Sequence, residues 1–133
     1  MGLNPPYIFL MGCLMIDENE LEQEMVDKGL IVPRVTPAGI DSKILSKAFY
    51  RFPGSTVTVC LLTLVNGFST LGESACASAE NFDEEIGRKL AFENARSKVW
   101  PLEGYLLRDA LHRQAQAEFD ATLASVHAEQ KQN

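Results

Sequence analysis

Two runs of β-forming residues flank the dipeptide Asn66-Gly67 near the middle of the chain. The segment 57–77 reads VTVCLLTLVNGFSTLGESACA, with β-branched and other apolar residues on both sides of the dipeptide. Asn and Gly readily take the positive φ angles that a two-residue hairpin turn requires. The pattern therefore predicts an antiparallel β-hairpin at the centre of the fold.

A two-residue turn also sets the register of the hairpin. It pairs Val65 with Phe68, and the pairing continues outward to Val57 with Cys76. Because successive side chains of a strand point to opposite faces, this register places Cys60 and Cys76 on opposite faces. We therefore expect both cysteines to be reduced.

The same register gives Glu73 an apolar setting, on one face with Cys60, Leu62 and Leu71. An unpaired carboxylate costs free energy in such a setting. Two interpretations stay open: a sheet-edge carboxylate that reaches solvent or pairs with Arg88 or Lys89, and a polar contact inside a ligand pocket.

Helical spacing of apolar residues precedes the hairpin. An acidic pattern over 19–28 ends at Gly29, a residue typical of helix C-termini. Thr36 and Pro37 then supply an N-cap and a proline at the first helical position. The apolar stripe that follows, up to Tyr50, consists of Ile40, Ile44, Leu45, Ala48 and Phe49. We expect one short acidic helix and a second helix over 37–50.

A third, longer helix is expected over 81–99. Asn81 and Glu84 have the spacing of a capping box. Its apolar residues lie on two sides, with Phe82, Ile86 and Leu90 on one and Ala91, Phe92, Ala95 and Val99 on the other. Two apolar sides indicate contact with a second helix or another subunit.

Trp100-Pro101 predicts a kink, because proline lacks the N–H and disfavours a helical conformation of the residue before it. A helical pattern resumes at Leu102 and forms a C-terminal helix. The fold class is therefore α+β: N-terminal helices, one central antiparallel β-hairpin, a long capped helix kinked at Trp100-Pro101, and a C-terminal helix. Since a lone hairpin is marginally stable, we expect oligomerisation to complete or cover the sheet, in a dimer or tetramer.

The domain organisation follows from these patterns. Residues 1–35 are expected to form an N-terminal extension with the short acidic helix, 36–128 a single α+β domain, and 129–133 a frayed tail. The apolar run 7–16 is too short for the ~20 residues of a membrane span, and no Lys or Arg precedes it as in a signal peptide. Two alternatives stay open: Met15 is the true start and residues 1–14 are an upstream extension, or the apolar run forms an ordered N-terminal strand. Both alternatives predict a cytoplasmic protein.

Charge is unevenly distributed along the 133 residues. The net charge is -6, and six of the 18 acidic residues fall within 17–27. From residue 31 onward, 12 acidic residues face 11 basic ones. Binding to duplex DNA needs clustered basic residues, so nucleic acid is not the expected partner.

Signatures of catalysis are absent from the sequence. Three scattered cysteines and two histidines, His112 and His127, do not have the spacing of metal ligands. The phosphate-loop, nucleophile-elbow, zinc-protease and dinucleotide-binding motifs do not occur. We therefore expect no enzyme activity, no metal and no cofactor.

An anion-binding stripe is the main candidate for function. Arg88, Phe92 and Arg96 recur every four residues and share one side of the third helix. Guanidinium groups bind phosphate and an aromatic ring stacks on a base, so the stripe predicts a nucleotide pocket that also includes Glu73, Tyr105 and Arg108. The alternative is a set of surface ion pairs beside a packed Phe92.

Several motifs resemble a family of short accessory proteins of tailed phages and prophages. They are Asn66-Gly-Phe, Gly72-Glu-Ser-Ala-Cys, Asn81-Phe-Asp-x-Glu-Ile-Gly-Arg-Lys-Leu-Ala, Asn94-Ala and Trp100-Pro-Leu-Glu-Gly-Tyr-Leu-Leu. The resemblance covers about Thr36 to Leu111. It implies a phage or prophage origin and action in the cytoplasm of an infected bacterium, and it assigns no functional residues.

Three functional hypotheses follow. The first is a non-enzymatic, homo-oligomeric binding protein that sequesters an anionic nucleotide-type signal of host defence. The second is an inhibitor or adaptor that binds a host protein through the region of Trp100 and Tyr105. The third is a virion or regulatory component that binds nucleic acid.

Overall fold

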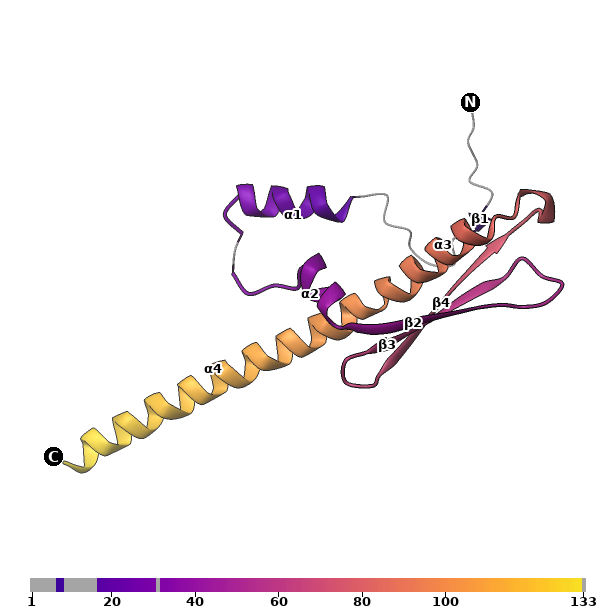
Figure 1. Ribbon diagram of the computed structural model, residues 1–133. Helices are drawn as coiled ribbons and strands as arrows, with labels where there is room; N and C mark the ends of the chain where they lie inside the picture. The colour runs from indigo at the N-terminus through magenta and orange to yellow at the C-terminus, as the bar shows by residue number, and fades with distance from the viewer. Residues whose placement is uncertain (1–6, 9–16, 31, 133) are drawn as a thin grey trace.

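The computed structural model describes residues 7–8, 17–30 and 32–132. Strands β2 (Ile44–Arg51), β3 (Thr58–Leu64) and β4 (Ser69–Cys76) form an antiparallel sheet, and the two-residue β1 (Tyr7–Ile8) pairs with the other edge of β4. The helices are α1 (Glu18–Asp27), α2 (Pro37–Ser42), α3 (Glu84–Ser97) and α4 (Val99–Lys131), with a short 3-10 turn η1 (Ala79–Asn81) before α3. Helix α3 lies across one face of the sheet and α4 continues beyond it (Figure 1). The predicted α+β class is confirmed.

The predicted central hairpin is present as β3 and β4, but its loop has three residues instead of two. The N–H of Leu64 donates to the carbonyl of Phe68 at 2.7 Å, and Gly67 in the loop has a φ of 89°. Three-residue hairpin loops place a glycine in this left-handed region. The predicted register is therefore wrong by one residue: Cys60 lies opposite Gly72, and Val59 lies opposite Glu73.

This shift moves the side chains of β4 to the other face relative to β3. Cys60 and Cys76, expected on opposite faces, both lie buried on the face that α3 covers. Both thiols are nevertheless free, as predicted. Glu73, expected with Cys60, is exposed on the outer face of the sheet.

The helix predicted over 37–50 is wrong beyond its first turns. Helix α2 ends at Ser42, and β2 starts at Ile44 and pairs with β3 along its length. The apolar residues of this segment have helical spacing, and pairing with β3 makes it a strand because that pairing satisfies the backbone of a whole strand. The chain itself thus supplies a third strand to the sheet that oligomerisation was expected to complete or cover.

Helix α3 is capped two residues later than predicted. The carboxylate of Asp83, not the side chain of Asn81, accepts a hydrogen bond from a first-turn backbone N–H, that of Ile86 at 3.0 Å. The break expected at Trp100-Pro101 lies earlier, at Lys98 between α3 and α4. Pro101 has no N–H to donate to the carbonyl four residues before it, so the helix is interrupted at that preceding turn.

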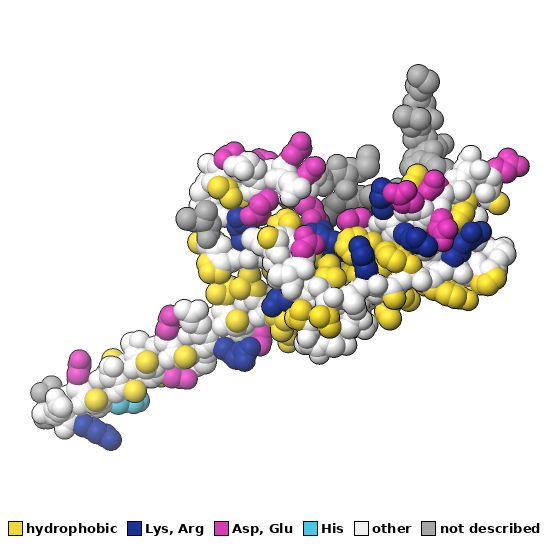
Figure 2. Space-filling model, in the orientation of Figure 1, with side chains coloured by type: hydrophobic (Ala, Val, Ile, Leu, Met, Phe, Trp, Pro, Cys, Tyr) yellow, Lys and Arg dark blue, Asp and Glu magenta, His cyan; other side chains and the backbone are white. Residues whose placement is uncertain are grey.

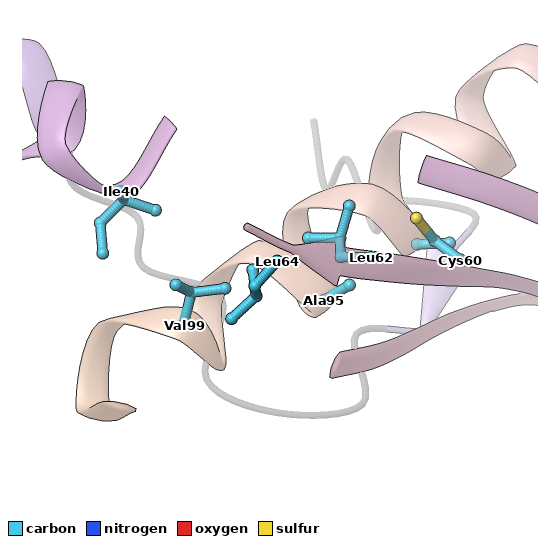
Figure 3. Close-up of a cluster of buried hydrophobic side chains, with 7 residues drawn as sticks. Ile40, Cys60, Leu62, Leu64, Ala95 and Val99 are labelled. Atoms are coloured by element: carbon cyan, nitrogen blue, oxygen red, sulfur yellow. The ribbon is translucent and has the colours of Figure 1, made fainter. Parts of the chain in front are cut away.

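A small core holds α3 on the sheet. It contains Ile40, Cys60, Leu62, Leu64, Ala91, Ala95 and Val99 (Figure 3). Buried hydroxyls of β4 reinforce it: Thr70 donates to the carbonyl of Ala95 at 3.0 Å and Ser74 to that of Gly87 at 2.7 Å. At Gly72 the two backbones meet, because a Cβ there would stand 2.1 Å from the Ala95 nitrogen.

No helix in the described part of the chain is both long and apolar enough to cross a membrane.

Candidate functional site

Arg96, the centre of the predicted anion site, is buried and bound to carboxylates of this chain. Its Nε donates to Asp41 Oδ1 at 2.8 Å and its Nη1 to Glu18 Oε2 at 2.7 Å, and its side chain is 8% exposed. These contacts join α1 and α2 to α3. Because Arg96 is already paired with two carboxylates, it links three helices and is not available to bind a phosphate.

Two other cations lie over aromatic rings where β2 runs beside α3. Lys47 Nζ is 4.9 Å from the centre of the Phe92 ring, and the guanidinium carbon of Arg51 is 4.3 Å from that of Phe82. Within the described ranges neither cation forms a salt bridge. Both are exposed. Arg51 Nε donates to the backbone carbonyl of Ser55 at 3.0 Å, a neutral acceptor that leaves the charge of the guanidinium available to an anion.

Arg88 belongs to the same surface. It lies one helical turn before Phe92 on α3 and is half-exposed, with Glu84 Oε1 at 2.9 Å. We call the set Lys47, Arg51, Phe82, Arg88 and Phe92 the β2–α3 seam. Figure 2 shows Lys and Arg side chains with hydrophobic side chains between them over this part of the molecule.

The remaining predicted residues do not join this seam. Glu73 lies on the outer face of the sheet, where only its backbone carbonyl meets α3, by accepting from Asn94 Nδ2 at 2.7 Å. Tyr105 is 72% exposed on α4, and Arg108 is exposed one turn further along. The structure thus brings together Arg88 and Phe92 and separates them from Arg96, Glu73, Tyr105 and Arg108.

Lys47 and Arg51 were missed because their segment was predicted to be helical. In the strand, Lys47, Phe49 and Arg51 share the face toward α3, while Ala48 and Tyr50 point to the other face. The one local signal for a strand here is the aromatic pair Phe49-Tyr50, because aromatic residues are common in strands.

A second feature is an apolar cavity between α1 and the start of α4. It has a volume of about 220 Å³ and is walled mainly by Leu21, Met25, Val35, Pro37 and Trp100, with Glu18 and Glu22 at its side. The indole N–H of Trp100 is buried and has no acceptor among the described residues. Trp100 therefore forms part of the cavity wall.

The described residues were compared with the requirements for a cysteine nucleophile and for a metal site. Burial raises the pKa of Cys60 to about 11, which leaves it a thiol at neutral pH. No group of three or more His, Cys, Asp or Glu side chains within the described residues is placed to hold a metal ion.

Comparison with known proteins identifies the origin of the chain. A family model, the phage protein (N4 Gp49/phage Sf6 gene 66) family, matches residues 35–111, which is more than half of the chain. The chain belongs to this phage protein family. The resemblance expected from the sequence motifs is thereby confirmed. No curated protein and no solved structure matches the chain.

The family range includes every residue of the β2–α3 seam and also Trp100. It does not include α1, which supplies Leu21, Met25 and the acidic residues beside the cavity. One candidate site therefore lies within the family domain, while the other combines the family domain with a segment outside the match.

Proposed function

We propose that this phage protein acts by binding and not by catalysis, and that its β2–α3 seam sequesters an anionic nucleotide-type signal of host defence. The protein would act in the cytoplasm of the infected bacterium, as a homo-oligomer. The single observation that carries the proposal is that Lys47 and Arg51 lie over Phe92 and Phe82 and form no salt bridge with any described residue.

The chemistry of the seam suits such a ligand. Cations on one strand and Arg88 on the facing helix can contact the phosphate oxygens, because guanidinium and ammonium groups form charge-assisted hydrogen bonds with phosphate. The aromatic rings beside them offer surfaces on which a base can stack. The net charge of the chain is -6, yet these two cations form no salt bridge with a carboxylate of the described residues, which favours a local anion site.

Calorimetric titration of cyclic and ADP-ribose-type nucleotides against the full chain tests this proposal. Wild type should bind one of them with a Kd below about 10 μM, or roughly -7 kcal/mol. The double variant Lys47→Glu/Arg51→Glu should abolish binding, since repulsion replaces attraction.

Arg113→Glu is the matched control, because Arg113 is an exposed, ion-paired cation on α4. It should bind like wild type, and circular dichroism should show all variants folded. Binding that survives the double reversal would place the ligand elsewhere, and a wild type that binds none of the nucleotides would contradict sequestration.

A second candidate function is inhibition or adaptation of a host protein through the Trp100 region. The apolar cavity beside Trp100 favours it, because a concave apolar site next to the exposed surface is typical of a protein-binding hot spot. Immobilised full-length protein should retain a host protein, and a variant with the cavity filled should not.

A further inference from the structure

The size of the cavity beside Trp100 limits what it can hold. Its volume of about 220 Å³ is below the roughly 300–1,000 Å³ of pockets for drug-sized ligands. It exceeds the roughly 150 Å³ of an engineered apolar cavity that accepts benzene. The space therefore suits one large apolar side chain and is too small for a nucleotide.

The residues that line the cavity are mainly apolar and suit an apolar side chain. Leu21 and Met25 are one turn apart on α1 and face Trp100 across the space, with Val35 and Pro37 completing the wall. Methionine adapts to irregular apolar groups. The indole N–H of Trp100 is buried in this wall and lacks an acceptor among the described residues.

The charge around the cavity defines the residues that flank this side chain. Asp17, Glu18, Glu20, Glu22, Glu24 and Asp27 all belong to α1 or its cap, whereas Lys28 is the one basic residue of 17–30. Figure 2 shows acidic side chains over the part of the surface that Figure 1 labels α1. Arg34 and Arg96 pair with the cavity acids Glu22 and Glu18, and Lys28 pairs with Glu24. Among the described residues, the acids of α1 and its cap that form no salt bridge are Asp17, Glu20 and Asp27.

We infer that the cavity takes an apolar side chain, such as Leu, Met or Phe, from a partner protein segment that carries Lys or Arg on both sides of it. The acidic helix attracts the flanking charges, and the cavity removes the central side chain from water. The inference rests on the second candidate function and names its class of partner. It is independent of the β2–α3 seam.

Selection from a displayed library of random dodecapeptides against the immobilised full chain tests the inference. Enriched peptides should carry one large apolar residue flanked by basic residues. Their affinity for variants is then measured by fluorescence anisotropy of labelled synthetic peptides, with circular dichroism to verify folding.

Two pairs of variants separate the apolar contribution from the charge. Met25→Phe fills the cavity and should weaken binding at least about tenfold, as loss of a central hot-spot contact does. Val26→Phe adds the same ring to an exposed position of α1 outside the cavity and should leave binding unchanged. Glu20→Lys should weaken binding about three- to tenfold in a salt-dependent manner, whereas Glu118→Lys, the same change on α4, should not.

The outcomes distinguish the inference from the function on which it rests. Peptides without basic residues that still lose affinity for Met25→Phe would overturn the partner class and leave protein binding at this cavity intact. Peptides insensitive to Met25→Phe would overturn the site. If no peptide is enriched, both the inference and the second candidate function are contradicted.

Discussion

Arg96 is the residue whose environment differs most from what the spacing of α3 suggests. It follows Arg88 and Phe92 at intervals of four residues, yet the helix turns it toward Asp41 and Glu18 instead of toward solvent. A buried guanidinium needs such partners, because an unpaired charge in the interior is costly. Arg96 therefore contributes to stability, and Arg88 is the residue of the stripe that is available for binding.

Replacement of Arg96 should accordingly lower stability. Arg96→Met should cost about 2–3 kcal/mol of the free energy of unfolding, because two hydrogen bonds between charged groups are lost and two carboxylates remain without their cation. Arg88→Met, at an exposed surface pair, should cost less than about 0.5 kcal/mol. Urea denaturation measures both, and equal effects would contradict the structural role of Arg96.

Glu93 lies close to the same group of charges. Glu93 is exposed, but neighbouring atoms exclude part of the water around its carboxyl group. This partial desolvation raises its pKa above the ordinary value of 4.5; the charge of Arg96 opposes this change, and the charges of Glu18 and Asp41 add to it. A carboxyl whose pKa is raised in the folded protein destabilises that state once it ionises, so the penalty is absent below the unfolded value and complete above the folded one.

Glu93→Gln should therefore raise the melting temperature at pH 7. The gain should shrink as the pH falls through the raised folded pKa and disappear below about 4.5. Thermal denaturation of both proteins between pH 4 and 8 measures this difference. Glu103→Gln on α4 is the control, and a stabilisation that does not depend on pH would contradict the electrostatic explanation.

At the scale of elements, the close contact between α3 and β4 depends on Gly72, because this position has no room for a side chain. Ala91 O would lie 2.3 Å and Ala95 N 2.1 Å from a Cβ at Gly72. Gly72→Ala should therefore destabilise the protein by about 3 kcal/mol or more, because backbone atoms on both sides must move.

Gly104→Ala is a matched control on α4, where nothing lies within 4 Å of the added Cβ. It should stabilise the protein by up to about 1 kcal/mol, since alanine is the better helix former. Chemical denaturation compares the two variants. Similar, small effects would show that α3 does not approach β4 as closely as this.

Elements defined by local chemistry were predictable from the sequence, and those defined by long-range pairing were not. Helix α1 with its stop at Gly29 and the hairpin around Gly67 follow from capping and turn residues. β2 does not, because the apolar residues of 44–51 have helical and not alternating spacing, and only the pairing with β3 makes this segment a strand. Because this segment was predicted to be helical, Lys47 and Arg51 were not recognised as part of the candidate site. The one-residue error in loop length placed Glu73 on the wrong face of the sheet.

At the scale of the whole molecule, apolar surface remains after the chain has folded. Ala95 and Val99, expected to contact a second helix or another subunit, lie in the core of this chain. The outer face of the sheet, by contrast, exposes Leu61 and Leu71, which are paired across β3 and β4 with 42% and 50% of their surfaces accessible. Helix α4 beyond residue 111 is exposed throughout its described length and presents Phe119.

Self-association is expected to cover the sheet, because adjacent apolar side chains on an open face favour packing against a second sheet. Analytical ultracentrifugation at micromolar concentration should give a dimer or tetramer. Leu71→Lys should shift the protein to the monomer, because the dimer would bury two ammonium groups close together. Phe119→Lys is the control: it places a lysine on α4 and should leave the association intact. The reverse result would move the interface from the sheet to α4, and a wild-type monomer would contradict self-association itself.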